Sequence, residues 1–418
     1  MLSLPNDGRY PALELAPQQR RQKTTEALIR QIEAIARRTP VLMIFEDAHW
    51  ISASTSGRVS RLSVIALTCG RPTQGAANSG RKVTSSRTCR ASILSTSRPN
   101  TSKLEGSAQK QGNAYAIVTF NNLKSFTALF GGDPLAASAH LDRGIALYNP
   151  ADHRPLTTRF GENQCDVALS FRAIALWLLG YPDRARADVD RAVKDGREIG
   201  QAATLFFTLY YKIWIETWCG DYASANLHAD ELVTLARERG AAPWELFGSV
   251  EQGWLHGLAG APAEAIRMLS AGLAGLRSIG VTFRVPADLT SLAEAHAELG
   301  QFEEATRSIR EAMSEIESKG SRMFEAEAMR VAGEIARKSP EPDAAEAEAW
   351  FERSLAVARK QQAKSLELRA TMSLARLRRD QGRRAEAHAL LAPVYGWFTE
   401  GFDTRDLKQA KALLDKLA

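Results

Sequence analysis

The sequence predicts an all-α protein built as a stack of helical hairpins, preceded by a short α/β segment and a segment without regular structure. Helical apolar patterning runs from residue 115 to the end of the 418-residue chain. Within it, a turn residue is followed five positions later by Ala six times, at intervals of 40, 40, 40, 42 and 40 residues. Such spacing indicates an array of identical units, each burying its apolar face against the next. The six pairs are Gly180/Ala185, Gly220/Ala225, Gly260/Ala265, Gly300/Ala305, Pro342/Ala347 and Gly382/Ala387.

The composition is that of a soluble chain with a large core, since 44% of its residues are hydrophobic. The first ten residues contain polar and charged side chains, so no signal peptide is expected. No run of about 18 apolar residues occurs, which predicts no membrane-spanning helix. The four cysteines form no Cys-x-x-Cys pair, which argues against zinc and against a disulfide framework. A cytoplasmic protein without a membrane partner is expected.

The net charge of +6 comes from one segment rather than from a basic face. Residues 52–112 hold ten Lys or Arg and a single acidic residue, Glu105, a balance of +9. The rest of the chain therefore carries 6 − 9 = −3. No nucleic-acid partner is predicted, because the helical part is mildly acidic.

Residues 1–51 predict a helix followed by a strand. The helix, at 17–38, places apolar side chains on one face and ends at Thr39-Pro40. The run Val41–Phe45 is continuously apolar, as in a strand buried on both faces of a parallel sheet. Glu46 and Asp47 follow it directly.

Residues 52–112 are predicted to be disordered. Twenty of these 61 residues are Ser or Thr, and apolar periodicity is nearly absent after Leu67. Such a segment cannot bury enough apolar surface to offset the entropy of ordering it.

Residues 113–418 accommodate seven helix pairs and a final capping helix over Thr404–Leu417. In each unit the turn Gly ends the first helix, and the Ala five residues later begins the second helix where the two cross closely. Seven residues before the turn, small residues again allow neighbouring helices to approach: Ala173, Gly253, Ala293 and Ala375.

This arrangement of small residues resembles the tetratricopeptide repeat. The period departs from the usual 34 residues of that family, which implies helices longer by about one turn. A HEAT-type array is the alternative on period alone, whereas the interval from Gly to Ala favours the tetratricopeptide interpretation. The resemblance implies a binding scaffold for a protein or peptide.

Aromatic residues on the first helices of successive units are candidates for a peptide-binding groove, since exposed rings suit peptide capture. The alternative is that they form the core between repeats. His256 and His296 occupy equivalent places, but without a third ligand at matching spacing we predict no metal site. The groove candidates are Trp177, Phe207, Tyr210, Trp214, Trp218, Phe247, Val250 and Trp254.

The segment PVLMIFEDAHWI has the form of a Walker B strand and resembles the signalling ATPases of the STAND class. In those proteins a nucleotide-switch domain precedes tetratricopeptide repeats, so Glu46 would match the acid nearest the metal and Asp47 the second acid. Ser52 stands where that class usually has Asp. No G-x-x-x-x-G-K-[ST] phosphate loop precedes the strand, so no ATP or Mg²⁺ cofactor is expected unless a partner chain completes the site.

The C-terminal text, from QQAKSLELRATM to LLDKLA, resembles the end of large bacterial proteins that join an adenylate/guanylate cyclase, a STAND-type ATPase and tetratricopeptide repeats. No cyclase domain is present. The resemblance implies that residues 1–51 are an ATPase remnant and that 113–418 form the repeats. We therefore predict a non-catalytic protein-interaction or regulatory module. The alternative is a residual nucleotide-binding ATPase or cyclase-family subunit completed by a partner chain.

Overall fold

The computed structural model describes Val41–Ile44, Val64–Leu67 and residues 114–157 and 161–418, and the chain divides into units Met1–Leu104 and Glu105–Ala418. In the first unit, strand β1 (Val41–Ile44) occupies the predicted apolar run. It pairs antiparallel with β2 (Val64–Leu67), with Val41 opposite Leu67. Both the helix expected at 17–38 and the rest of 52–112 lie outside the described residues.

The described part of the second unit is helical. The helices are α4 (Ala114–Phe130), α5 (Pro134–Leu147), α6 (Pro150–His153), η1 (Arg154–Leu156), α8 (Gln164–Leu178), α9 (Pro182–Ile199), α10 (Ala202–Cys219), α11 (Tyr222–Glu238), α12 (Ala242–Leu258), α13 (Pro262–Ser278), α14 (Val285–Glu298), α15 (Phe302–Lys319), η2 (Arg322–Phe324), α16 (Glu325–Lys338), α17 (Ala344–Lys360), α18 (Lys364–Asp380), α19 (Arg384–Tyr395) and α20 (Arg405–Leu417).

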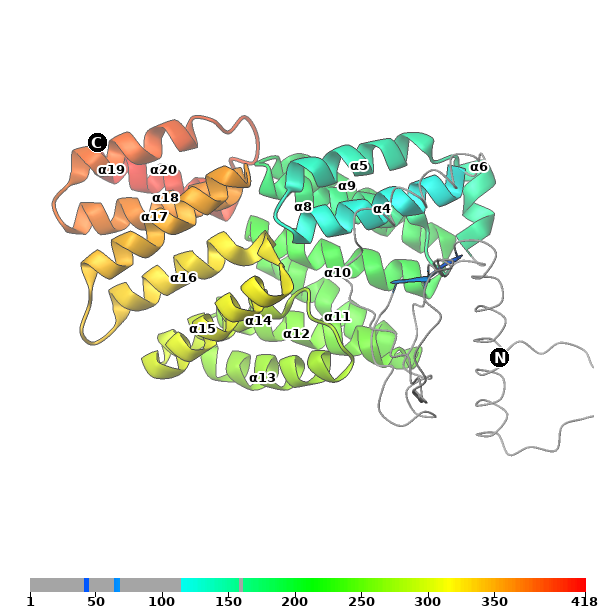
Figure 1. The fold of residues 1–418 in the computed structure, drawn as a ribbon, viewed down its shortest axis with the longest axis horizontal. Coiled ribbons are helices and arrows are strands. Elements are labelled where there is room, and N and C mark those ends of the chain that lie inside the picture. Colours follow the sequence, from blue (N-terminus) through cyan, green and yellow to red (C-terminus); the bar gives the residue numbers. More distant parts are fainter. Residues whose placement is uncertain (1–40, 45–63, 68–113, 158–160) are drawn as a thin grey trace, which may run out of the picture. The chain divides into compact units, whose positions relative to one another are not determined.

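These helices form the predicted hairpins. Within the described residues, seven pairs pack closely: α4 with α5, α8 with α9, α10 with α11, and so on to α18 with α19. The first helices of successive pairs also contact one another, which makes an inner row of α8, α10, α12, α14, α16, α18 and finally α20. The second helices lie against the outside of that row (Figure 1). The prediction of an all-α hairpin array is confirmed for this unit.

The repeated small residues do what the spacing predicts. Gly180, Gly220, Gly260, Gly300 and Gly382 all have φ between +72° and +92°, which L side chains rarely adopt. The Ala five positions after each of them has no exposed surface. A methyl group on Gly253 would lie 2.9 Å from Met268 Cβ, so the helices cross too closely there for a larger residue. Pro342, the exception, lies in a loop between α16 and α17.

The row of hairpins turns back on itself within the second unit. Helix α18 contacts α8, although about two hundred residues separate them. Ser365 donates a hydrogen bond to the Trp177 carbonyl at 2.5 Å, and Phe130 of α4 packs against Phe324 of η2. Figure 1 shows the C-terminal helices, in orange and red, returning beside the helices near α8. Stacking with a small rotation per hairpin therefore completes a turn of superhelix over these residues.

Candidate functional site

Most of the predicted groove aromatics are core residues. Trp177, Tyr210, Trp214 and Phe247 expose between 2% and 5% of their surface. Their rings stack on one another: the centroids of Trp177 and Trp218 lie 4.5 Å apart, and those of Tyr210 and Phe247 lie 5.2 Å apart. Because the inner row curls, neighbouring helices cover these rings. A partner could not reach them without opening the core.

The other predicted residues have different environments. Phe207 is half-buried among other rings, and Val250 is fully buried. Trp218 and Trp254 line a cavity between the inner helices. Glu46 and Asp47 of the predicted Walker B strand lie outside the described residues.

A sealed ionic cluster lies at the centre of the aromatic core. Arg284 is 2% exposed and donates to both carboxylate oxygens of Asp288, at 2.9 and 2.7 Å. It also donates to Glu251, which is fully buried, and to the Tyr210 hydroxyl. Trp214 Nε1 donates to the same Glu251 oxygen at 3.0 Å. The guanidinium is also 5.5 Å and 5.7 Å from the centroids of Tyr210 and Trp214.

The charges of this sealed cluster depend on one another. Burial by itself would lower the pKa of Arg284, but Asp288 and Glu251 outweigh burial and raise it well above its usual value. Burial raises the pKa of Glu251 and of Asp288 even though Arg284 opposes the shift. Removal of the arginine would therefore leave two buried carboxylates uncompensated.

A second polar region surrounds the cavity, whose volume is about 260 Å³. Its walls come from α10 to α14 on one side and from α16, α18 and α20 on the other. Four arginines and four acidic side chains line it: Arg330, Arg369, Arg376, Arg405, Glu294, Glu298, Glu327 and Asp406.

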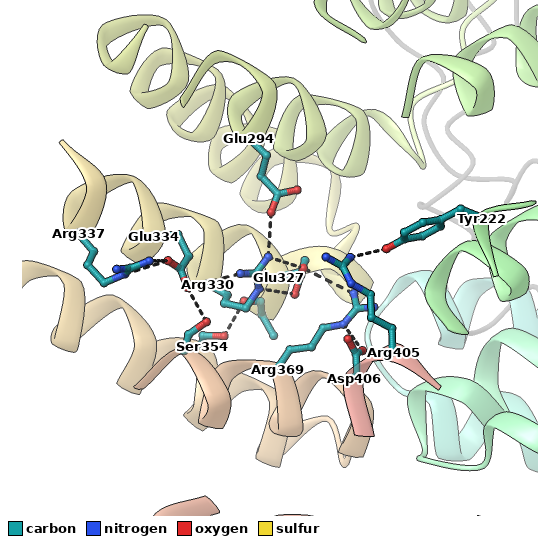
Figure 2. Close-up of polar contacts among 12 residues, drawn as sticks. Tyr222, Glu294, Glu327, Arg330, Glu334, Arg337, Ser354, Arg369, Arg405 and Asp406 are labelled. Carbon is teal, nitrogen blue, oxygen red and sulfur yellow. Dashed lines mark hydrogen bonds and ion pairs between the residues drawn. The ribbon is translucent and has the colours of Figure 1, made fainter. Parts of the chain in front are cut away.

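Two of these arginines hold four inner helices together (Figure 2). Arg330 of α16 donates to Glu294 of α14 at 2.9 Å and to Glu327 at 2.8 Å. Arg369 of α18 donates to Asp406 of α20 at 2.6 Å and lies 3.6 Å from Glu327. Burial would raise the pKa of Glu327, but Arg330 and Arg369 outweigh burial and lower it. Arg369 is thus a bridge between α16 and α20.

Helix α20 reaches the cavity because the segment before it is fastened to α9. Glu400 accepts hydrogen bonds from the backbone N–H groups of Asp183 and Arg184, at 2.9 and 3.1 Å, in the first turn of α9. The Asp183 carboxylate accepts from the Gly401 N–H at 3.0 Å. Arg186 donates to both oxygens of Asp403, at 3.0 and 2.8 Å. We call this contact between residues 397–406 and the turns at 180 and 220 the closing seam.

Glycines allow the closing seam to pack. A methyl group on Gly220 would overlap Arg405 Cβ, and one on Gly401 would overlap Pro182. By contrast, a methyl group on Gly260 or Gly300 would meet nothing within 4 Å. Turns of the same conformation are thus closely packed against other residues at the closing seam, whereas the turns at Gly260 and Gly300 are open.

Both cysteines of the described residues are buried and free. Burial raises the pKa of Cys165 and of Cys219 to about 12, so both are neutral thiols near pH 7. No group of three His, Cys, Asp or Glu side chains within the described ranges could hold a metal ion. His256 is exposed, and His296 Nδ1 lies 2.6 Å from the Gln301 amide oxygen. None of the helices described is both long and apolar enough to cross a bilayer.

Charged helix positions are most simply interpreted as solvated faces, so the charged residues of the cavity were not predicted, although Trp218 and Trp254 were named as groove candidates. That interpretation suits Glu304 and Arg307, an exposed pair on α15. Arg369 carries a different signal, since the residues three positions before and after it on the same face of an inner helix, Leu366 and Met372, are apolar and buried. A charge on the apolar face of a first helix was the clue to an interior polar site.

No known protein family matches the sequence, and no curated protein is significantly similar to it. Among solved structures, the chain is similar to a Signal Transduction ATPase with Numerous Domains (STAND) protein with a tetratricopeptide repeat sensor from Pyrococcus horikoshii. The identity is 15% and the TM-score 0.41, over 76% of this chain and 45% of that one. It is also similar to yeast Tom70, with 14% identity and a TM-score of 0.37, over 76% of this chain and 58% of that one. The chain spans about half the length of these two structures.

Proposed function

We propose that the hairpin unit is a non-catalytic protein-interaction or regulatory module. The observation that carries the proposal is a set of exposed rings at the closing seam. Trp397 and Phe402 expose 37% and 49% of their surface, and they lie beside Tyr181 and Tyr395 respectively. Exposed aromatic side chains of this size are enriched in the residues that dominate binding energy at protein interfaces.

Cationic side chains frame these rings. Arg184 lies over the Tyr181 ring at 4.5 Å from its centroid, and Lys364 lies over Trp397 at 5.4 Å. Both cations already have a carboxylate partner, Glu400 for Arg184 and Glu367 for Lys364, so a partner surface of mainly apolar side chains would complement this patch. The predicted partner is therefore a protein or peptide, bound at the seam rather than on the buried aromatic groove.

The test is cross-linking of the full chain in the cells that produce it. A photo-reactive phenylalanine analogue at Phe402 is expected to capture one dominant protein. The same analogue at Leu227, which is 66% exposed on the outer helix α11, is the control and should not capture that protein. A Phe402→Ser variant, with Leu227→Ser as its match, should lose co-purification of the same protein. Equal capture at both positions, or none at either, contradicts the proposal.

As part of the same proposal, we infer that this chain derives from a signalling ATPase or cyclase. We also infer that it neither catalyses a reaction nor binds a nucleotide by itself. The alternative is a nucleotide-binding subunit completed by a partner chain, and the strand Val41–Ile44 followed by Glu46 and Asp47 favours it. Equilibrium titration with a fluorescent ATP analogue and Mg²⁺ separates the two. Micromolar binding that Glu46→Ala and Asp47→Ala abolish would establish the alternative.

A further inference from the structure

The arginines of the cavity differ in whether they have an anionic partner. Arg330 and Arg369 together engage Glu294, Glu327 and Asp406, which are three of the four acidic residues in the lining. The fourth, Glu298, is exposed at the end of α14. The carboxylates inside the cavity are thus already paired, whereas two arginines of the lining, Arg376 and Arg405, have no ion pair with any carboxylate of the described residues.

Arg376 is the clearest example of an arginine without a carboxylate partner, and Arg369 on the same helix is the paired arginine with which it can be compared. The two lie seven residues apart, on one face of α18. Arg376 donates only to the Gln409 amide oxygen, at 3.3 Å, and weakly to Met372 Sδ, at 3.9 Å. Burial lowers the pKa of Arg376, and nearby Arg330 adds to the shift. For Arg369, Asp406 and Glu327 outweigh burial and raise the pKa.

Arg405 provides a second donor with spare capacity at the same cavity. It is the first residue of α20, it is exposed, and it donates to the Tyr222 hydroxyl, with the Tyr222 ring 5.5 Å from the guanidinium. A guanidinium has five N–H donors, so most of those on Arg405 remain available. Guanidinium groups recognise carboxylate and phosphate oxygens in paired geometry.

The opposite wall of the cavity is apolar and aromatic. Trp218, Trp254, Leu258 and Leu269 line it. A volume of about 260 Å³ is just below the range of about 300–1,000 Å³ typical of small-molecule sites. The space therefore suits a small molecule with one ring or a short apolar body, and it is too small for an extended peptide.

We propose that this cavity binds a small organic anion, whose carboxylate or phosphate group is held by Arg376 and Arg405 and whose apolar body packs on Trp254 and Trp218. The site goes beyond the protein-interaction function, since its ligand is not a protein. The two arginines come from α18 and α20, whereas the apolar wall comes mainly from α10 and α12. A bound anion would therefore join the C-terminal helices to the early ones and stabilise the closing seam, which lies next to the exposed rings.

The experiment uses the full chain and three probes: benzoate, phenyl phosphate and the uncharged benzyl alcohol. Isothermal titration and the shift of the unfolding midpoint are measured with each. At least one of the two anions is expected to bind and to raise the midpoint, and the one that binds more tightly identifies the headgroup. Benzyl alcohol should bind at least tenfold more weakly. Failure of both anions to bind at millimolar concentration overturns the proposal.

Two variants test the assigned arginine. Arg376→Gln should weaken anion binding at least tenfold, whereas Arg379→Gln should not, because Arg379 pairs with Asp380 on the same helix and does not line the cavity. Gln409→Glu places a carboxylate where Arg376 now meets an amide. It should raise the unfolding midpoint and abolish anion binding. This second variant keeps the test decisive even if Arg376→Gln does not fold. Unchanged anion binding in Gln409→Glu contradicts the assignment.

Discussion

The sealed cluster around Arg284 and the cavity wall around Arg369 contain the same group of side chains in different environments. In each, one arginine joins two carboxylates and lies over a tryptophan ring, at 5.7 Å from Trp214 for Arg284 and at 4.9 Å from Trp177 for Arg369. Arg284 is surrounded by protein, whereas Arg369 faces a cavity and bridges α16 to α20, its two neighbours in the inner row.

The difference shows where this fold is fixed and where it can respond. In the sealed cluster one guanidinium serves two buried carboxylates, so each charged group has an ionic partner inside the protein, although Glu251 Oε2 accepts no hydrogen bond from the described residues. The cavity wall keeps Arg376 without a carboxylate, within reach of a ligand. A buried cluster whose charged groups all have partners stabilises one arrangement of helices. An arginine without a carboxylate partner can instead bind an anion, and the free energy of that binding then stabilises the fold.

The largest effect is expected for Arg284→Leu. This change leaves Glu251 and Asp288 buried without a counter-charge, and breaking such a group typically costs about 3–5 kcal/mol. Urea unfolding followed by tryptophan fluorescence measures the loss. The triple variant Arg284→Leu, Glu251→Gln, Asp288→Asn should recover part of it, because the two carboxylates are then neutral. A loss below about 1 kcal/mol for the single variant would show that the cluster is solvated.

Arg369→Leu should cost less, about 2 kcal/mol, because cavity water can solvate Glu327 and Asp406 after the change. Its specific effect should be local. Hydrogen exchange in α20 is expected to accelerate more than exchange in α12, since Arg369 is the ion-pair partner that α20 has on α18 through Asp406. Arg379→Leu is the control on the same helix. Uniform acceleration over all helices would mean that Arg369 supports the whole fold rather than the closing seam.

The turn glycines sharpen the comparison further. Gly220 and Gly260 have φ of +86° and +80°, so replacement by Ala strains both backbones equally, by about 1–2 kcal/mol. Only at Gly220 would the new methyl also overlap Arg405. We expect Gly220→Ala to be less stable than Gly260→Ala by a further 1–2 kcal/mol, roughly the cost of overpacking. Equal losses in thermal unfolding would mean that the closing seam opens in solution.

The hairpins were predictable from the sequence because their determinants are local. A positive-φ glycine and a crossing alanine recur at fixed offsets, and both turned out as expected. A second set of glycines carries the same local signal in the turns between hairpins, where Gly200, Gly240, Gly280 and Gly320 also have positive φ. Together the two sets mark a turn every 20 residues from 180 to 320.

The superhelical closure was not predictable from one sequence. It depends on a small rotation at each hairpin, summed over the unit, and no local pattern specifies that sum. The groove aromatics show what this means for prediction. They lie on the inner helices as expected, but whether they are exposed depends on the closure of the superhelix. Arg376 and Arg405 face the apolar residues of α10 and α12 across the cavity for the same reason, because α18 and α20 meet the early helices only after a complete turn.

The smallest predicted effect is a difference in pH dependence between the two clusters. The pKa of Glu327 is lower in the folded chain than its usual value, so its contribution to stability is present at neutral pH and is lost as the pH falls through that lowered pKa. The pKa of Glu251 is raised by burial, so its linkage has the opposite sign, and protonation favours the folded state.

Glu327→Gln should therefore flatten the loss of stability between about pH 5 and pH 3, and Glu251→Gln should make the loss of stability on acidification steeper. Each change in slope is below one proton, or about 1.4 kcal/mol per pH unit, and urea midpoints measured at half-unit intervals resolve it. Slopes that change in the same direction would mean that water reaches the sealed cluster as it reaches the cavity wall.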